Sequence, residues 1–326
     1  MGYRHLSIDE REVILKMRAQ QASMQQIADY LGRNAGTISR ELSRNVSSTH
    51  DYKPHLAQGY YQKRRDASKQ SYRLEDDASL RAYVKINLKK YWSPEQISGR
   101  VKKEQGVDIS PVTIYSWIYR HRDEGDQLHK YLRQAHRHRR KRRGGQDHRG
   151  QMPDRRMIDK RPKVVSKRKR IGDWESDTVE GRKGSGFIAT HVDRKARYTV
   201  AVKTEDKSTD TVTRATFKAM KKLPPEKIKT MTFDNGKEFA GFKELERWLD
   251  MRSYFAWPYH SWERGTNENT NGLLRQFFPK GMDFRPIRQS DLDKAVVLLN
   301  NRPRKCLSYR TPTEVFWSIP MCCASD

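Results

Sequence analysis

The sequence predicts an α+β protein of several domains, with an all-helical N-terminal region followed by a mixed α/β domain. At 326 residues, the chain is long enough for two or three domains that each have a core. Up to about residue 130, apolar residues recur at helical spacing between serine caps and glycine breaks. From Ile171 onward, short β-type runs alternate with helical ones, and a stretch rich in Lys and Arg separates the two regions.

Three short helices are predicted near the N-terminus. Ser7 begins a capping box with Glu10 and is followed by apolar residues at helical spacing. Two further helices, at 24–31 and 35–44, are separated by a glycine, which is the layout of a helix-turn-helix. The polar face of the last helix points away from its buried face and can meet base edges and phosphates. The candidate DNA contacts here are Arg33, Thr37, Arg40 and Arg44.

A second copy of this layout is predicted further along the helical region. Ser93-Pro94 is a helix start, Gly106 breaks that helix, and Ser110-Pro111 starts the next one. The outward-facing residues of this second recognition helix are Thr113, Ser116 and Arg120. Either copy could instead be an ordinary helical hairpin with a solvated outer face, and the sequence leaves that alternative open.

The net charge of +27 and the pI near 10 indicate a polyanionic partner. Nucleic acid is favoured over membrane lipid, because the basic residues do not form an amphipathic lipid-binding helix and no run approaches the ~18 apolar residues of a membrane span. Residues 131–170 alone hold 17 Lys or Arg and 3 Asp. We expect this stretch to be a mobile linker that buries no core and follows the DNA backbone. A merely solubilising spacer is the alternative.

The C-terminal region predicts three antiparallel strands, then a helix, a strand, a second helix and a last short strand. This order is that of an RNase H-like mixed sheet. The strands are predicted at 172–180, 186–192, 198–204, 228–233 and 252–256, and the helices at 209–222 and 239–249. The predicted domains are a helix-turn-helix domain at 1–50, connecting helices with a second helix-turn-helix at 51–130, a basic linker at 131–170, and the RNase H-like domain with C-terminal helices at 171–326.

Three acidic residues with distinctive flanking sequences follow one another in this domain. They are Asp177, Asp234 and Glu268, with 33 residues between the last two. Carboxylate oxygens are the ligands that Mg²⁺ and Mn²⁺ prefer, and two such ions can clamp the attacking and leaving oxygens of a phosphoryl transfer. Strand periodicity places Asp173 and Glu175 on the same face as Asp177, so it does not select the ligand among these three.

Glu268 is predicted to lie on a helix at about 264–278. On a helical projection, Asn271 and Arg275 share its edge, while the apolar residues fall on the other side. The guanidinium of Arg275 suits phosphate oxygens, so both residues are candidate substrate contacts. A solvated helix face with an incidental ion pair is the alternative for this helix taken alone.

Several long motifs in order resemble those of the DDE transposases and retroviral integrases, and most closely the IS30-type insertion-sequence transposases. The motifs are Gly172-Asp-Trp-Glu-Ser-Asp-Thr-Val179, Phe233-Asp-Asn-Gly-Lys-Glu-Phe239, Trp262-Glu-Arg-Gly-Thr-Asn-Glu-Asn-Thr-Asn-Gly-Leu-Leu-Arg-Gln276, Phe278-Pro-Lys-Gly281, Leu299-Asn-Asn-Arg-Pro-Arg-Lys305 and Thr311-Pro-Thr-Glu-Val-Phe316, together with Ile38-Ser-Arg-Glu-Leu42. The resemblance implies that Asp177, Asp234 and Glu268 are the metal ligands and that Arg275 is their basic partner. Ser176 stands where the family usually has glycine, a difference that the site tolerates sterically.

The resemblance implies a transposase that binds the inverted-repeat ends of its element and cleaves and joins DNA strands. It further implies two Mg²⁺ or Mn²⁺ ions, double-stranded DNA as ends and as target, and a homodimer or larger synaptic assembly. Three cysteines are too few for a disulfide framework, which agrees with a bacterial cytoplasm and association with the nucleoid. The alternatives are a DNA-binding repressor with an inactive RNase H-like domain and a structure-selective nuclease.

Overall fold

A computed structural model of the chain describes residues 5–45, 52–68, 73–122, 127–133, 154–258 and 265–320. The contacts within the chain divide it into two units, residues 1–77 and residues 78–326. None of the helices in these described ranges combines the length and the apolar character needed to span a bilayer. Each unit is described below by itself.

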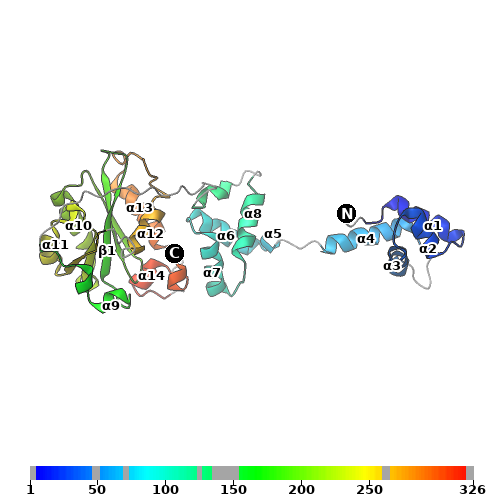
Figure 1. The fold of residues 1–326 in the computed structure, drawn as a ribbon, viewed down its shortest axis with the longest axis horizontal. Coiled ribbons are helices and arrows are strands. Elements are labelled where there is room, and N and C mark those ends of the chain that lie inside the picture. The colour runs from blue at the N-terminus through cyan, green and yellow to red at the C-terminus, as the bar shows by residue number, and fades with distance from the viewer. Residues whose placement is uncertain are drawn as a thin grey trace. The chain divides into compact units, whose positions relative to one another are not determined.

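The first unit is a cluster of helices around a small apolar core (Figure 1). The helices of this cluster are α1 (Ile8–Ala19), α2 (Met24–Leu31), α3 (Ala35–Asn45) and α4 (Pro54–Ser68), and the short helix α5 (Arg73–Asp76) contributes no residue to the core. The predicted capping box of Ser7 and Glu10 is confirmed, and Gly32 ends α2 in the left-handed conformation at φ 61°. Ile14, Ile27 and Ile38 are fully buried where α1, α2 and α3 meet. The helix-turn-helix prediction for α2 and α3 is therefore confirmed.

A buried ion pair fixes α1 against α3 inside this unit. The Arg11 Nε donates to Glu41 Oε1 at 2.7 Å, and the two residues are only 2% and 8% exposed. The Tyr52 hydroxyl donates to the same carboxylate oxygen at 3.2 Å. Because an unpaired charge would be costly here, the three side chains hold the orientation of α3 relative to the rest of the unit.

The second unit begins with another helical hairpin. Its elements are α6 (Ala78–Lys89), α7 (Pro94–Gln105), α8 (Pro111–Arg120) and the 3₁₀ helix η1 (Gln127–Tyr131). Ser93 caps α7 with proline at its first position, and Gly106 ends it in the left-handed conformation at φ 69°. Ser110 caps α8 in the same way. The predicted helix boundaries in this hairpin are thus confirmed, and its buried residues include Ile97 and Ile114.

This hairpin is docked on the C-terminal segment of the same unit. The Arg100 guanidinium on α7 donates two hydrogen bonds to Glu314, at 2.8 and 2.5 Å, across 214 positions of sequence. Both residues are 1% exposed. One residue earlier, Gly99 faces the Tyr309 ring so closely that a Cβ would come within 2.2 Å of it. A side chain at position 99 would therefore push the hairpin away from the segment.

The rest of the second unit is built on a five-stranded sheet with the order β3-β2-β1-β4-β5. The strands are β1 (Asp173–Glu180), β2 (Phe187–Asp193), β3 (Thr199–Thr204), β4 (Thr230–Phe233) and β5 (Arg252–Phe255). The first three pair antiparallel, while β4 lies parallel to both β1 and β5. This topology confirms the predicted RNase H-like mixed sheet.

Helices cover both faces of the sheet (Figure 1). Trp174 of β1 points into a core formed with α10 and α11, whereas Val179 points into a second core formed with α12 and α13. Odd-numbered residues of β1, including the acids, therefore face the α12 side. The helices are α10 (Thr209–Met220), α11 (Phe242–Leu249), α12 (Gly265–Leu274), α13 (Gln289–Asn300) and α14 (Pro312–Phe316), with 3₁₀ turns η3 (Pro225–Lys227), η4 (Lys237–Phe239) and η6 (Lys305–Leu307).

Part of the basic stretch differs from the prediction. Residues 134–153 lie outside the described residues, but residues 154–170 pack on the sheet through η2 (Ile158–Lys160) and α9 (Lys163–Ser166). Met157 pairs with Phe255 in a parallel bridge, and Val165 is fully buried. The expectation that the stretch buries no core is thus wrong for residues 154–170, because a few apolar side chains among the basic ones suffice to dock it.

Candidate active site and nucleic-acid interface

The register of two neighbouring parallel strands places the first two predicted metal ligands beside each other. Glu175 of β1 is opposite Thr232 of β4, so two residues further along each strand bring Asp177 level with Asp234. Asp234 directly follows the end of β4, where its Oδ1 accepts a hydrogen bond from the Gly236 backbone N–H at 3.0 Å. Both acidic side chains are partly exposed. They therefore meet at an accessible end of the β1–β4 pair.

Burial distinguishes the three acids of β1 that strand periodicity leaves equivalent. Asp173 is 1% exposed and accepts two hydrogen bonds from Arg170, each of 3.0 Å. Glu175 is fully buried, and its Oε2 accepts the Asn267 backbone N–H at 2.9 Å. Asp177 is the member of the three that reaches solvent. The other two carboxylates are engaged inside the fold, which favours Asp177 as the residue open to a ligand.

A network of polar side chains fastens α12, the helix that carries Glu268, to the sheet. The Asn271 Nδ2 donates to Asp177 Oδ2 at 3.0 Å. The Thr190 hydroxyl of β2 lies 2.8 Å from Asn271 Oδ1 and 3.0 Å from Asn267 Oδ1, so it can donate to either amide oxygen. Glu268 itself is on the exposed side of the helix. The network thus fixes the carboxylate of Asp177 and the position of Glu268 together.

Asn271 and Arg275, predicted as substrate contacts, both bond within the protein. The Asn271 amide is directed at Asp177, as described above. The Arg275 Nη2 donates to the backbone oxygen of Glu180 at 2.7 Å, and its Nη1 donates to that of Phe278 at 3.4 Å. Burial lowers the pKa of Arg275. In this structure Arg275 therefore joins the end of α12 to the end of β1.

The helix is also shorter than predicted. It ends at Leu274, and the chain then forms turns through Phe278 whose backbone N–H donates to the oxygen of Leu274 at 3.0 Å. Arg264, the predicted first residue, lies outside the described residues. The apolar spacing that suggested a longer helix instead reflects burial of Leu273, Leu274 and Phe278 in one core.

The donor chemistry of the acidic site suits a hard divalent cation. Asp177 on β1 and Asp234 just after β4 offer carboxylate oxygens where the pairing of these two strands ends, and Glu268 is carried on a helix that is hydrogen-bonded to Asp177. Within the described ranges, no three His, Cys, Asp or Glu side chains are gathered closely enough to form a complete metal cluster. The residues present fit magnesium or manganese in donor type.

Ser176, the residue at which this chain departs from the family pattern, has a partner of its own. Its hydroxyl lies 2.9 Å from His191 Nδ1, and both side chains are fully buried. Burial lowers the pKa of His191 to about 4, so the imidazole is neutral near pH 7. The pair therefore joins β1 to β2 on the face opposite the acids, and His191 has a structural role.

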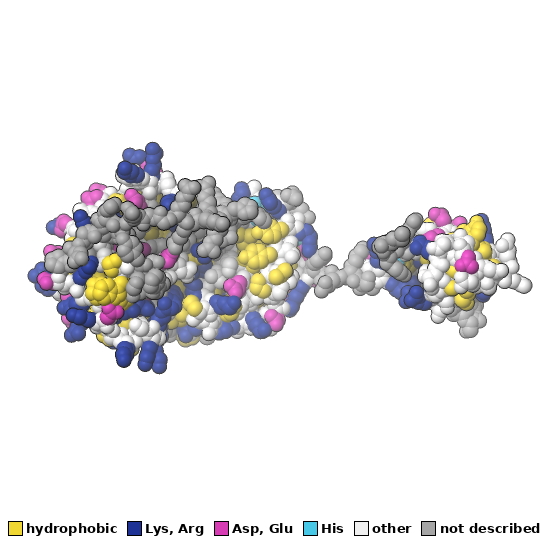
Figure 2. Space-filling view, in the orientation of Figure 1, with side chains coloured by type: hydrophobic (Ala, Val, Ile, Leu, Met, Phe, Trp, Pro, Cys, Tyr) yellow, Lys and Arg dark blue, Asp and Glu magenta, His cyan; other side chains and the backbone are white. Residues whose placement is uncertain are grey.

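In the first unit, three predicted DNA contacts line one hollow of about 460 Å³. Thr37, Arg40 and Arg44 of α3 share it with Arg64 and Arg65 of α4, which the sequence interpretation had left without a role. Figure 2 shows basic side chains over the α3–α4 side of this unit. The hollow is therefore a basic surface made by the recognition helix and the helix that follows it.

Arg33 lies apart from this hollow and pairs with an acid. Its Nη2 is 2.8 Å from Glu10 Oε1, and its Nε donates to the same oxygen at 2.9 Å. The pair joins the turn after α2 to the first turn of α1. Arg33 thus contributes to the packing of the helix-turn-helix.

The second candidate recognition helix, α8, keeps its polar face outward. Ser116 and Arg120 are exposed, and Thr113 is partly exposed, with its backbone N–H bonded to the Ser110 hydroxyl at 3.0 Å. Ile114 is fully buried on the opposite face. The arrangement leaves these three side chains accessible to a partner.

Comparison with known proteins adds to this geometry. The helix-turn-helix domain family matches residues 2–45, and the integrase core domain family matches residues 167–261. The chain is 40% identical over 97% of its length to the transposase for insertion sequence element IS4351 of Bacteroides fragilis, and this match covers 96% of that protein. This chain belongs to the IS30 family of insertion-sequence transposases.

Two other relatives span nearly the whole transposase. The InsI transposase for IS30A of Escherichia coli strain K12 is 38% identical over 95% of this chain and 83% of its own length. The transposase for IS1086 of Cupriavidus metallidurans is 36% identical over 97% of this chain and 95% of its own. The transposase is thus a DDE polynucleotidyl transferase with a DNA-binding domain, a class of core domain that generally uses divalent metal.

Sequence reasoning missed Thr190 and Asn267, two members of the network around α12. A signal was present, because residues 266–271 read Thr-Asn-Glu-Asn-Thr-Asn, and short polar residues of this kind are poor helix formers. A helix that nevertheless forms there needs tertiary hydrogen bonds for these side chains. In the transposase, Asn267 donates to the backbone oxygens of Glu175 on β1 and Thr190 on β2, and Asn271 donates to Asp177 on β1.

Proposed function

We propose that this transposase binds the terminal inverted repeats of its own insertion sequence, cleaves the DNA strands at those ends and joins them to target DNA. One observation carries the proposal. The register of β1 and β4 brings Asp177 of β1 beside Asp234, which follows β4, and the helix that bears Glu268 donates a hydrogen bond to Asp177 through Asn271. The helix-turn-helix in the same chain supports the choice of a particular DNA sequence.

Two Mg²⁺ or Mn²⁺ ions held by Asp177, Asp234 and Glu268 would activate the attacking oxygen and stabilise the leaving oxygen of the phosphodiester. The residues of the chain orient that site. Asn271 fixes Asp177 Oδ2, and the Thr178 backbone N–H donates to Asp177 Oδ1 at 2.9 Å. These two hydrogen bonds hold the side chain in one orientation, and because a carboxylate oxygen has two lone pairs, neither bond by itself prevents cation binding.

The direct test uses the full chain, duplex DNA that contains the ends of the element, and Mg²⁺. We expect strand cleavage at the ends followed by joining to a second duplex. Hydrolysis without joining would favour a structure-selective nuclease, and end binding without cleavage in Mg²⁺ or Mn²⁺ would favour a repressor. Because two ends are joined in one event, we also expect a dimer or larger assembly on DNA, in the bacterial nucleoid.

Removing the basic side chains of the α3–α4 hollow should weaken recognition of the ends. We expect Arg40→Gln with Arg44→Gln to reduce affinity for inverted-repeat DNA by roughly 10- to 100-fold, since a base or phosphate contact contributes about 1–3 kcal/mol. Binding titrations with inverted-repeat and unrelated duplexes would measure this loss of affinity. Arg18→Gln, on the exposed part of α1, is the matched control. Equal losses for both duplexes would contradict a role in sequence recognition.

Loss of the Asn271 amide should impair the acidic site without unfolding it. We expect Asn271→Ala to slow cleavage about 10- to 100-fold and to raise the Mg²⁺ concentration needed for half-maximal rate. Mutation of a residue that is hydrogen-bonded to a metal ligand typically lowers metal affinity or activity by this amount. The rate is measured against Mg²⁺ at saturating end DNA. A slower rate with an unchanged Mg²⁺ dependence would show that Asn271 does not act through Asp177.

A further inference from the structure

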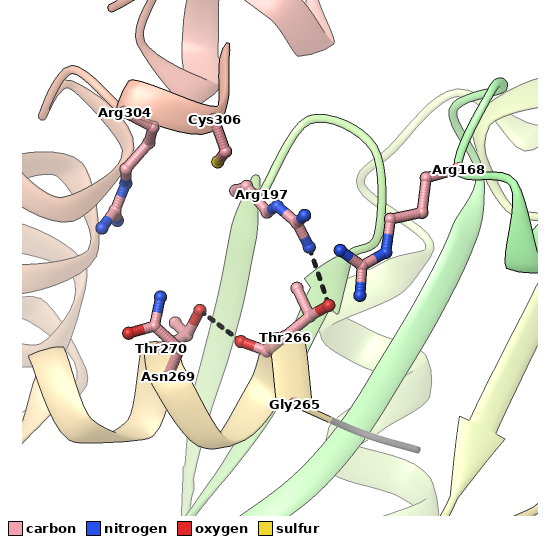
Figure 3. Close-up of a pocket in the computed structure, with 8 residues that line it drawn as sticks. All are labelled: Arg168, Arg197, Gly265, Thr266, Asn269, Thr270, Arg304 and Cys306. Atoms are coloured by element: carbon pink, nitrogen blue, oxygen red, sulfur yellow. Dashed lines mark hydrogen bonds between the residues drawn. The ribbon is translucent and has the colours of Figure 1, made fainter. Parts of the chain in front are cut away.

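A second basic pocket lies in the catalytic unit, apart from the acidic residues. It has a volume of about 260 Å³ and is lined by Arg168, Arg197 and Arg304, by Cys306 and by the first turns of α12, including Thr266 (Figure 3). The three arginines come from separate segments: the turn after α9, the turn between β2 and β3, and the residue before η6. Three segments distant in sequence thus each contribute an arginine to the lining of one hollow.

Among the residues that the structure describes, the three guanidinium groups of this pocket form no ion pair with an acid. Glu175 lies near enough to Arg168 to raise its pKa, but burial and the charges of Arg197 and Arg194 outweigh that effect and lower it. Arg304 is 8% exposed, and its Nε has no hydrogen-bond partner, although its Nη2 donates to the Leu299 backbone oxygen at 3.1 Å. Burial, with Arg197 as a further cause, lowers the pKa of Arg304 to about 10, so it stays charged at pH 7. A buried, unpaired charge is costly, and an anion in the pocket would offset that cost.

The N-terminal end of α12 adds to the positive potential in this pocket. Gly265 and Thr266 form the first turn of α12, a helix of 10 residues whose N-terminal end carries a partial positive charge. The Arg197 Nη1 donates to the Thr266 hydroxyl at 2.7 Å, which directs this guanidinium to the helix end (Figure 3). Helix dipole and arginines therefore favour the same ligand, a compact anion with several acceptor oxygens such as a phosphate group.

The pocket lies on the other side of α12 from the acidic site. Thr266 and Thr270, which line it, project about 160° away from Glu268 around the helix, and Asn269, which also lines it, projects about 100° away. A helix is about 10 Å across, which corresponds to roughly three nucleotides at a rise of 3.4 Å per residue of one strand. A phosphate in the pocket is therefore distinct from the phosphodiester at Asp177, but close enough to belong to the same DNA.

We propose that the pocket of Arg168, Arg197 and Arg304 binds one backbone phosphate of the DNA, a few nucleotides from the phosphodiester that reacts. This assignment rests on the proposed function, and it makes the three arginines DNA-binding residues outside the catalytic site. They would add to the affinity for the DNA backbone and would make no contact with the reacting atoms. Their loss should accordingly weaken DNA binding and leave the rate of the bound complex unchanged.

Cys306 provides a readout at the pocket that does not depend on activity. Its thiol is exposed and lines the pocket, so its alkylation by iodoacetamide can be followed in the full chain carrying Cys322→Ser and Cys323→Ser. We expect duplex DNA with the element ends to slow alkylation several-fold. Protection by inorganic phosphate but not by DNA would make the pocket a small-anion site and would overturn the assignment.

The second experiment measures the salt dependence of DNA binding. We expect Arg168→Gln with Arg197→Gln to lower the slope of log K against log salt concentration by about 0.9, the loss of one phosphate contact. The single-turnover cleavage rate at saturating DNA should match that of the wild type. Both side chains are at least partly exposed, so the melting temperature should change little, and Arg247→Gln on the exposed face of α11 is the matched control.

The outcomes separate this assignment from the proposed function. If the wild type binds and cleaves DNA, while the double variant keeps the full salt slope and Cys306 is not protected, the pocket assignment fails and the function stands. A wild-type chain that binds no DNA in either assay would overturn both. A slower single-turnover rate at saturating DNA would contradict a role confined to DNA binding.

Discussion

Replacing any one of the three acids by its amide will lower strand cleavage by roughly a thousandfold or more, since metal-ion stabilisation contributes several kcal/mol and each 1.36 kcal/mol is tenfold in rate. The variants are Asp177→Asn, Asp234→Asn and Glu268→Gln. Each amide keeps the shape of the side chain but removes the negative charge and one acceptor oxygen. The measurement is single-turnover cleavage of end-containing duplex in Mg²⁺.

End binding should remain close to that of the wild type in all three variants, because the helix-turn-helix lies in the other unit of the chain. Glu244→Gln is the matched control, since this acid is exposed on α11. Near-normal cleavage by any one acid variant would remove that residue from the ligand set. In that case Glu175 and Asp173 would not be ready substitutes, since both are buried and hydrogen-bonded inside the fold.

The elements that local sequence signals specify were predictable to within a few residues. Serine caps and glycine breaks marked the ends of α2, α7 and α8. These residues provide hydrogen bonds for the unpaired backbone groups at helix ends through contacts within one turn. The strands followed from short β-type runs, and the sheet order from the sequence of strands and helices. The placement of Asp177 beside Asp234 follows from the same strand pairing.

Contacts between distant segments were not predictable in this way. Nothing near Arg168, Arg197 or Arg304 in sequence indicates that they share a pocket, because each is an isolated arginine in a basic chain. The docked part of the basic stretch was missed for a similar reason. Val165 is one apolar residue among many cations, and its burial depends on a surface formed elsewhere in the chain.

The role of Asn271 shows the same limit at the candidate site itself. A helical projection correctly put it on the edge of Glu268, but it could not say whether the amide meets DNA or protein. The structure directs the amide to Asp177, with Thr190 of β2 supporting it from the other side. The projection thus predicted an exposed amide, whereas the contact with the neighbouring strand shows that this amide donates a hydrogen bond to Asp177.

The ion pair between Arg100 and Glu314 is the contact whose loss should most affect stability of the second unit. We expect Arg100→Met to lower the free energy of unfolding by about 3–5 kcal/mol, because it leaves Glu314 buried without its partner. For a unit of this size that is a fall of roughly 10 °C in melting temperature. Thermal and urea unfolding of the full chain would measure the change.

The double variant with Arg100→Met and Glu314→Met separates the charge from the packing. With both charges removed, much of the lost stability should return, since well-packed apolar residues can replace a buried ion pair at little cost. Lys305→Gln, which removes the exposed pair with Glu95, is the control and should change stability by less than about 1 kcal/mol. If both pairs had equal effects, burial would not be the reason for the stabilisation.

The same pair predicts how stability depends on pH. Burial alone would raise the pKa of Glu314, but the hydrogen bonds from Arg100 and from the Thr311 backbone hold it below the ordinary value of 4.5. A carboxyl whose pKa is lower in the folded state stabilises the fold above its unfolded value and loses that effect as the pH falls through the folded one. The stability difference between wild type and Glu314→Gln should therefore be constant near neutral pH and shrink below about pH 4.5. A difference that grew on acidification would mean that Glu314 is not held as the anion by Arg100, and the docking of α7 would then depend on the close contact of Gly99 with Tyr309.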